Sequence, residues 1–217
     1  NIQTCLSNIQ APIPAWNPQM KLHDLDLSGN AYKVRLFLSL IGREATLRPV
    51  DFLNREHKTQ AFLRMNPRGQ IPVLEDGELQ LGDSHAILVY LARRHAGPEW
   101  YPLDPVSQGR IAYWLSYSAN EVQNGPASAR LITRFNLPLD REQTHQRGLE
   151  VLRLVDRHLA EHRWLAQGEQ PSIADVALYP YLALAPEGGL ALDHYLALNA
   201  WIARIRALPG YIPMPGL

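Results

Sequence analysis

Two serine residues stand directly ahead of predicted helices, where they could act on an anion. Ser28 separates a short apolar segment from a helical pattern, and Ser84 follows Asp83 at the start of another such pattern. The free backbone amides and the dipole of a helix N-terminus favour negative charge, and a serine hydroxyl adds a further donor. Either serine could instead be an ordinary helix cap. The sequence therefore offers two places for an anion and leaves binding and capping both open.

The composition narrows the chemistry that these residues could perform. Cys5 is the only cysteine in 217 residues, which excludes an internal disulfide framework, a cysteine-rich zinc site and a CxxC redox pair. Lys plus Arg and Asp plus Glu both number 21, so no net charge would gather nucleic acid or an anionic membrane surface. The longest uncharged apolar run, 176–186, is too short to span a bilayer. We therefore expect a soluble protein that acts on small molecules, with no nucleic-acid partner, no membrane partner and no metal.

Ser28 belongs to a predicted strand, turn and helix. Residues 22–27 are typical of a short strand, and a Ser-Gly-Asn turn follows. Apolar residues then recur at the helical spacing i, i+3, i+4 and i+7 as far as a stop at Gly42. Residues 46–50 should form a second strand parallel to the first, and residues 59–65 at most two turns of helix. These segments predict a βαβ unit with a short helix after it.

Ser84 belongs to a helix that follows a predicted hairpin. Residues 71–75 and 78–81 are short apolar runs on either side of Asp76-Gly77, a pair that favours a tight hairpin turn. Asp83-Ser84 then precedes an apolar helical face, and either residue could cap its first turn. The element order β-α-β-α-β-β-α is thereby complete.

Glycine and proline residues between 97 and 105 separate this part of the chain from a second part with no convincing strand. Helical patterning runs from residue 107 to the end of the chain. Ser172-Ile173-Ala174-Asp175 is typical of a capping box that starts a buried helix. We therefore expect two domains, at residues 20–97 and 106–217.

Residues 1–19 do not look like part of either domain. They contain no charged residue, three prolines and no apolar period, and they lack the basic region and apolar segment of a secretory signal. We expect an added leader or tag. The alternative is a natural tail anchored on the surface by Trp16.

Three motifs at matching separations resemble the cytosolic glutathione transferases. They are Asn66-Pro67-Arg68-Gly69-Gln70-Ile71-Pro72-Val73-Leu74, Asp76-Gly77 and Asp83-Ser84-His85-Ala86-Ile87, and the segment 171–176 resembles the capping-box helix of the family's second domain. The resemblance covers Met20 to about Pro215, and it favours a bacterial member of the serine or asparagine type, theta-like or nu-like. It implies an α/β plus all-α fold: an N-terminal thioredoxin-like βαβαββα domain that binds glutathione, followed by an all-helical C-terminal domain.

The resemblance also assigns residues to the γ-glutamyl and cysteinyl parts of glutathione. Pro72 would follow a cis peptide bond, which turns the main chain of Ile71 toward the cysteinyl backbone of the ligand. The alternative is a trans proline that begins a strand. Ser84 would hold the γ-glutamyl carboxylate, with Gln70 in support. Asp83 would receive the ammonium group of the ligand, or hold it across a dimer interface.

Cationic residues are expected at the glycyl carboxylate of glutathione. His57 and Lys58 precede the short second helix, where transferases of this kind place such groups, and Arg68 is a third candidate. Lys58 is charged near neutrality, whereas His57 is only partly so. Without the resemblance, Glu56-His57-Lys58 would indicate no more than a solvated loop.

Ser28 is the residue expected to activate the thiol, by donating its hydroxyl to the sulfur at the positive end of a helix. In some bacterial and fungal members an asparagine at the position of Asn30, ahead of a Lys-Val pair matched by Lys33-Val34, contacts the sulfur. The role therefore falls to Ser28, to Asn30 or to both. A thiol with a pKa of about 8.5 is only slightly ionised at neutral pH, so a pKa lower by about two units would make most of the bound ligand nucleophilic. Tyr32 lies too far into the helix to replace them, and no cysteine is placed for thiol exchange.

The electrophile is expected between the domains, against the first long helix of the second one. An aromatic stripe at helical spacing, 113–120, offers Tyr117 as a pocket residue, although such stripes usually pack in a core. Arg130 and Arg134 could favour an anionic co-substrate, or they could form a solvated face.

The leading hypothesis is an enzyme, a glutathione transferase that conjugates the glutathione thiolate to small hydrophobic electrophiles. Glutathione would be the co-substrate, and the protein would be a cytoplasmic, twofold homodimer. Two alternatives stay open: a glutathione-dependent reductase of disulfides or peroxides, and a non-catalytic binding protein with the same fold.

Overall fold

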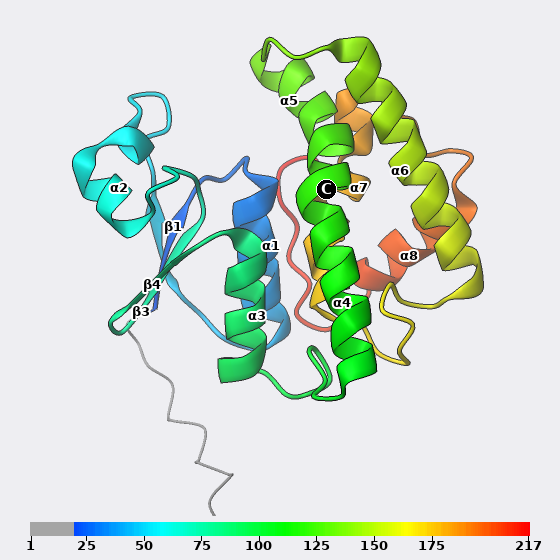
Figure 1. The fold of residues 1–217 in the computed structure, drawn as a ribbon, viewed down its shortest axis with the longest axis horizontal. Coiled ribbons are helices and arrows are strands. Elements are labelled where there is room, and N and C mark those ends of the chain that lie inside the picture. Colours follow the sequence, from blue (N-terminus) through cyan, green and yellow to red (C-terminus); the bar gives the residue numbers. More distant parts are fainter. Residues whose placement is uncertain (1–19) are drawn as a thin grey trace, which may run out of the picture.

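The computed structural model describes residues 20–217, so the expected leader at 1–19 lies outside the described residues. A sheet with its helices forms one side of the molecule, and a group of helices forms the other (Figure 1). The predicted fold class is confirmed: a thioredoxin-like N-terminal domain precedes a helical C-terminal domain. The exact domain boundaries, 20–97 and 106–217, stay predictions.

The N-terminal domain has the expected βαβαββα order. Its elements are β1 (Lys21–Asp24), α1 (Gly29–Leu40), β2 (Thr46–Pro49), η2 (Glu56–Lys58), α2 (Gln60–Met65), β3 (Val73–Asp76), β4 (Leu79–Gly82) and α3 (Ser84–His95). The strands lie in the order β2-β1-β3-β4, with β1 parallel to β2 and antiparallel to β3. Strands β3 and β4 form the predicted hairpin, and its turn places Gly77 at a φ of 62°. Such a positive φ explains the glycine.

The first strand is shorter than the sequence predicts. It ends at Asp24, because the amide of Ser28 donates to the carbonyl of Leu25 (2.8 Å) and closes a turn. Leu25 and Leu27 are only half-buried, so apolar burial does not extend the strand to residue 27. The turn places Ser28 at the start of α1.

The C-terminal domain is helical throughout, and no strand follows β4 within the described residues. Its elements are α4 (Pro105–Tyr117), η3 (Ser118–Ala127), α5 (Ser128–Phe135), α6 (Arg141–Glu161), α7 (Ile173–Ala183), η4 (Ala185–Gly188) and α8 (Leu196–Arg206). The wide π-helical segment η3 joins α4 to α5. The predicted capping box begins α7: the Ser172 hydroxyl accepts from the amide of Ala174, and Asp175 accepts from the amide of Ser172 (2.9 Å). From residue 20 onward, no helix combines the length and the hydropathy that a membrane span requires.

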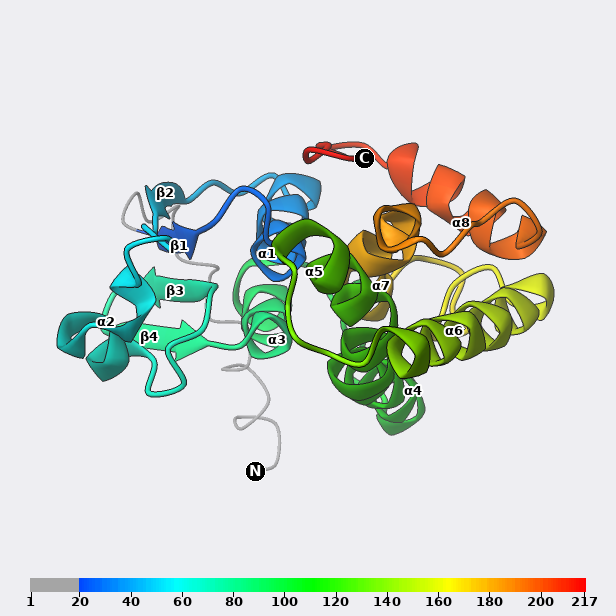
Figure 2. The same ribbon diagram turned by 90° about the horizontal axis from the view of Figure 1, so that it is seen from above.

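Helix α7 is the centre of the contact between the domains. Every residue from Ile173 to Ala183 is buried, which is typical of a helix packed on all sides. Helices α1 and α3 lie between the sheet and the C-terminal domain, and α2 lies on the opposite side of the sheet (Figure 2). The C-terminal segment returns to α1, where the Tyr32 hydroxyl donates to the carbonyl of Ile212 (2.6 Å). The start of α1 is therefore fixed by both domains.

Candidate active site

Ser28 is the N-cap of α1, as the sequence allows. Its Oγ accepts a hydrogen bond from the amide of Ala31 (3.2 Å), and the side chain is half-buried. Capping uses a lone pair of the hydroxyl oxygen and leaves the hydroxyl proton available. No acidic residue lies in the first turn of α1, so no carboxylate offsets the positive end of the helix dipole. Ser28 can therefore cap the helix and still donate to an anion.

Gly29 allows a side chain from the other domain to reach this helix end. A Cβ at this position would lie 2.7 Å from Cε1 of Tyr181 in α7, so any larger residue would push the ring away. Burial raises the pKa of Tyr181 to about 12, so its hydroxyl stays protonated at neutral pH. Tyr181 was not predicted as a site residue, because no local signal links it to residues more than 150 positions earlier.

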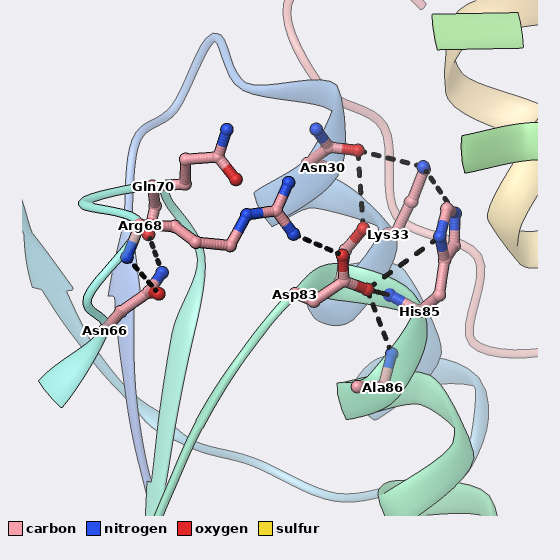
Figure 3. Close-up of polar contacts among 9 residues, drawn as sticks. Asn30, Lys33, Asn66, Arg68, Gln70, Asp83, His85 and Ala86 are labelled. Carbon is pink, nitrogen blue, oxygen red and sulfur yellow. Dashed lines mark hydrogen bonds and ion pairs between the residues drawn. The ribbon is translucent and has the colours of Figure 1, made fainter. Parts of the chain in front are cut away.

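The side-chain amide of Asn30 is bonded to other residues through its oxygen. Its Oδ1 accepts from the Nζ of Lys33 (2.9 Å) and lies 3.3 Å from the Oγ of Ser84, which donates to it. Among the described residues no acceptor is found for its Nδ2. In Figure 3 this nitrogen points away from Lys33, on the side where Gln70 and Arg68 lie. Asn30 therefore offers a free donor two residues along the chain from Ser28.

Lys33 is the residue of this cluster that the sequence reasoning missed as a functional group. It is 1% exposed, and burial lowers its pKa to about 7, with Asp83 acting in the opposite direction. Its Nζ lies 3.2 Å from Nε2 of His85, and that nitrogen lies 3.1 Å from Oγ of Ser118 in η3. Burial, and then Lys33, lower the pKa of His85 to about 3, so the imidazole is neutral. A polar chain therefore joins Asn30 to the C-terminal domain.

The N-terminus of α3 is capped by an acidic residue. Asp83, at a φ of 73°, is the N-cap, and its Oδ1 accepts from the amides of His85 (2.9 Å) and Ala86 (3.2 Å). Its Oδ2 lies 3.5 Å from Nη1 of Arg68, in an ion pair exposed to solvent. Ser84 is buried as the first residue of the helix. Asp83 thus lies beside Arg68, on the same side as Asn30 (Figure 3), and Ser84 is joined to Asn30 by its hydroxyl.

The Ile71–Pro72 peptide bond is cis, as the family resemblance implies. The ladders of β3 begin at Val73, so the backbone of Ile71 lies outside the sheet pairing. The carbonyl of Gln70 accepts from Nδ2 of Asn66 (2.8 Å), which shapes the loop ahead of the strand. The Gln70 side chain is exposed. The loop carries Arg68 and Gln70 on the side where Asn30 and Asp83 lie (Figure 3).

Lys58 is bonded to the same loop, whereas the His57 ring packs elsewhere. The Nζ of Lys58 donates to the carbonyls of Gly69 (2.9 Å) and Arg68 (3.3 Å). His57 is buried and stacks on Phe52 with ring centroids 4.2 Å apart. Burial, and then the neighbouring cations, lower the pKa of His57, so it carries less charge than the sequence suggested. In this structure Lys58 therefore supports the loop, and the His57 ring packs against Phe52.

Tyr117 is not brought together with the other candidate residues. It lines a hollow between η3 and α6 with Asn120, Arg147 and Glu150, whereas its neighbour Ser118 reaches His85 at the start of α3. The hollow that Tyr117 lines is therefore formed by α4, η3 and α6, and none of its lining residues belongs to α1 or α3.

Arg130 departs from the expected solvated face. It is 2% exposed, its Nε lies 2.6 Å from a carboxylate oxygen of Glu187, and its Nη1 donates to the carbonyl of Leu27 (2.9 Å). Arg134 lies on the more exposed side of the same carboxylate (3.2 Å). Arg130 is buried because it pairs with Glu187, which lies 57 residues later in the chain, and helical periodicity does not reveal such a partner. Arg130 therefore ties α5 to the residue just before Ser28.

No group of three or more His, Cys, Asp or Glu side chains suited to a metal ion occurs in the described part of the chain. The site consists instead of hydroxyl, amide and main-chain donors around two helix N-termini, with one carboxylate and one exposed guanidinium. Such a set can bind a small zwitterionic molecule and hold an additional anion.

Comparisons with known proteins agree with this geometry. Residues 18–93 match the family model "Glutathione S-transferase, N-terminal domain", and residues 139–209 match "Glutathione S-transferase, C-terminal domain". Glutathione S-transferase theta-2B from Homo sapiens is 30% identical over 188 residues, which cover 82% of this chain and 76% of the relative.

Solved structures give the same result. A glutathione S-transferase from Pseudomonas fluorescens superposes with a TM-score of 0.84 at 35% identity, over 90% of this chain and 98% of the other. A glutathione transferase homologue from Drosophila mojavensis, with bound glutathione, gives a TM-score of 0.79 at 25% identity, over 88% and 89% of the two chains. These relatives support an enzyme that conjugates glutathione and uses it as a co-substrate. The chain therefore belongs to the glutathione S-transferase family.

Proposed function

We propose that Ser28 and Asn30 together stabilise the thiolate of bound glutathione. Both residues stand at the N-terminus of α1, where no acidic side chain of the first turn opposes an anion. The hydroxyl proton of Ser28 and the amide Nδ2 of Asn30 are both available to a ligand, because the bonds that hold these side chains use their oxygen atoms as acceptors. These two available donors at one helix end are the observation that carries the proposal. They also favour the serine or asparagine type within the family, whether theta-like or nu-like.

The start of α3 and the cis-proline loop bind the remainder of glutathione in this proposal. Ser84 receives the γ-glutamyl carboxylate, and Asp83 receives the ammonium group. Gln70 supports this end of the ligand, and the main chain of Ile71, set by Pro72, pairs with the cysteinyl backbone.

The glycyl carboxylate lies toward η2 in the proposed complex. Lys58 supplies positive charge there, since an ammonium group has more donors than the carbonyls of Gly69 and Arg68 occupy. His57 acts mainly by packing against Phe52, because it is buried and its pKa is lowered.

The reaction is conjugation of the thiolate to a small hydrophobic electrophile. The sulfur electron pair forms a bond to the electrophilic carbon, and the leaving group departs with its bonding electrons, so no oxidant or reductant is required. The two alternatives, reduction of disulfides or peroxides and binding without catalysis, differ in their products. Turnover of a chloronitrobenzene substrate distinguishes conjugation from both.

A homodimer completes the proposal. Val106 and Tyr113 of α4 are 60% and 56% exposed, and they line a hollow between α4 and α6. Apolar side chains exposed along a hollow suit a self-complementary twofold contact. Light scattering after gel filtration tests the dimer: a mass of twice 24.5 kDa supports it, and the mass of a monomer contradicts it. A cytoplasmic location stays a prediction.

Replacing Ser28 with alanine tests the proposed role in thiol activation. A hydrogen bond to a charged partner contributes roughly 1.5–3 kcal/mol, so turnover of chloronitrobenzene should fall by about tenfold or more. The affinity for glutathione, measured by calorimetry, should change much less. Unchanged turnover would assign the thiolate to Asn30 alone, and absence of saturable glutathione binding by the unsubstituted protein would contradict the whole proposal.

A further inference from the structure

Lys33 is a buried cation without a close carboxylate. It is 1% exposed within α1, and no ion pair to an acidic side chain is formed by it among residues 20–217. Burying an ammonium group is unfavourable unless other groups replace its water. A methionine or leucine would fill the same space without that penalty. A lysine at this position therefore needs an explanation beyond packing.

The partners of Lys33 supply that explanation. Its Nζ donates to Oδ1 of Asn30 (2.9 Å), one helical turn earlier, and lies 3.2 Å from Nε2 of His85. It also lies 5.2 Å from the ring centre of Tyr181, within the range of a cation–π contact. The titratable groups around it are thus Asp83 at the N-cap of α3, His85 in α3 and Tyr181 in α7. Of its hydrogen-bond partners, Asn30 has a further polar group, Nδ2, which points away from Lys33 toward the side of Gln70 and Arg68 (Figure 3).

We propose that Lys33 is a positioning residue, which fixes the side-chain amide of Asn30 so that Nδ2 faces the sulfur of glutathione. The carboxamide has acceptors on its oxygen and donors on its nitrogen, and the two ends are nearly alike in shape. Lys33 and Ser84 both place donors against the Oδ1 end. A rotation of the amide by half a turn would set N–H groups against these donors. The amide is thereby held in the one orientation that offers a donor to an anion.

This orientation does not depend on the charge of Lys33. Both the ammonium and the neutral amine carry N–H groups that can donate to Oδ1 of Asn30. The lowered pKa of Lys33 therefore leaves the positioning intact on both sides of neutrality. The inference rests on the proposed function, because it requires Asn30 to contact the sulfur.

The test is a double-mutant cycle between Lys33 and Asn30, with the thiol pKa of bound glutathione as the readout. Lys33→Met keeps the apolar volume and removes the donor. It should raise the thiol pKa by about one unit and lower kcat/KM about tenfold, with little change in glutathione affinity at acidic pH. In an Asn30→Ala background the same substitution should have no further effect, because the amide that Lys33 orients is absent.

Each outcome of the cycle decides one question. If Asn30→Ala leaves the thiol pKa unchanged, the proposed role of Asn30 fails and the inference fails with it. If Asn30→Ala raises the thiol pKa but Lys33→Met does not, only the positioning role is overturned. An equal effect of Lys33→Met with and without Asn30 would overturn it too, since Lys33 would then act by its charge alone.

Two further variants distinguish a specific effect on Asn30 from a general disturbance of the fold. Lys33→Gln keeps an amide donor without the charge, and it should retain a thiol pKa closer to that of the unsubstituted protein than Lys33→Met does. Ser118→Ala is the matched control, because it removes a buried polar partner on the far side of His85 without touching Asn30. Its thiol pKa should stay unchanged. A shift equal to that of Lys33→Met would show that any break in the polar chain disturbs the site, and would overturn the specific role of Lys33.

Discussion

The N-termini of α1 and α3 lie in the same domain and both carry a serine, yet they differ in charge. Helix α1 is capped by the neutral hydroxyl of Ser28 and has no acidic residue in its first turn. Helix α3 is capped by the carboxylate of Asp83, which accepts from two amides and lies beside Arg68. The positive end of α1 is therefore uncompensated, whereas that of α3 already has a negative partner.

This difference separates two tasks in the proposed mechanism. An uncompensated helix end with neutral donors suits a single anion such as a thiolate. A helix end that combines a serine with a carboxylate suits a group that carries both charges, such as the γ-glutamyl end of glutathione. Activation and anchoring of one ligand are thus divided between two helix starts that look alike in the sequence.

The largest effect is expected when α1 is given the acidic cap of α3. Ser28→Asp retains a good N-cap, so the helix should keep its stability. It removes the hydroxyl donor and adds a negative charge beside the sulfur, so kcat/KM for chloronitrobenzene should fall by about 100-fold, further than for Ser28→Ala. Steady-state kinetics with thermal unfolding as a stability control measures both effects. Activity equal to that of Ser28→Ala would show that the charge of the helix end is irrelevant.

Neutralising the cap of α3 should affect binding instead of activation. Asp83→Asn keeps a capping side chain but removes the charge offered to the ammonium group, so glutathione affinity should weaken by about tenfold. The thiol pKa of the glutathione that does bind should stay the same. Calorimetry and thiolate absorbance measure the two quantities separately. A shifted thiol pKa with unchanged affinity would reverse the roles assigned to the two helices.

The smallest effect on turnover is expected from the contact that holds α1 to the C-terminal domain. Glu187→Gln leaves the buried guanidinium of Arg130 without its counter-charge, so the free energy of unfolding should fall by about 2–3 kcal/mol. Activity of the folded protein should change only a few-fold. Urea unfolding followed by fluorescence gives the stability change. Arg134→Met is the control, because it removes only the more exposed partner of Glu187 and should change stability by about 1 kcal/mol or less. Equal losses for both variants would contradict the importance of the buried pair.

Local signals were sufficient to predict most of the N-terminal domain. The Asp76-Gly77 turn, the caps of α1 and α3 and the capping box of α7 depend on residues within a few positions of one another, and all are present in the structure. The prediction of the first strand, 22–27, was too long at its C-terminal end, because a backbone hydrogen bond from Ser28 to Leu25 forms a turn there.

The parts of the site that could not be predicted depend on distant partners. The orientation of Asn30 requires Ser84, 54 residues later, and the burial of Arg130 requires Glu187, 57 residues later. In the sequence, Lys33 resembles any helical lysine, because its burial depends on α3 and α7, which lie far away in the chain. Periodicity shows which face of a helix is apolar, and it does not show which polar residue will be buried there.

Stabilisation of the thiolate is measured by a pH titration of glutathione bound to the unsubstituted protein, followed by the ultraviolet absorbance of its thiolate. If the start of α1 stabilises the ionised sulfur, the midpoint should lie about two units below the value of about 8.5 for a free thiol. A midpoint equal to that of free glutathione, at saturating occupancy confirmed by calorimetry, would contradict the account.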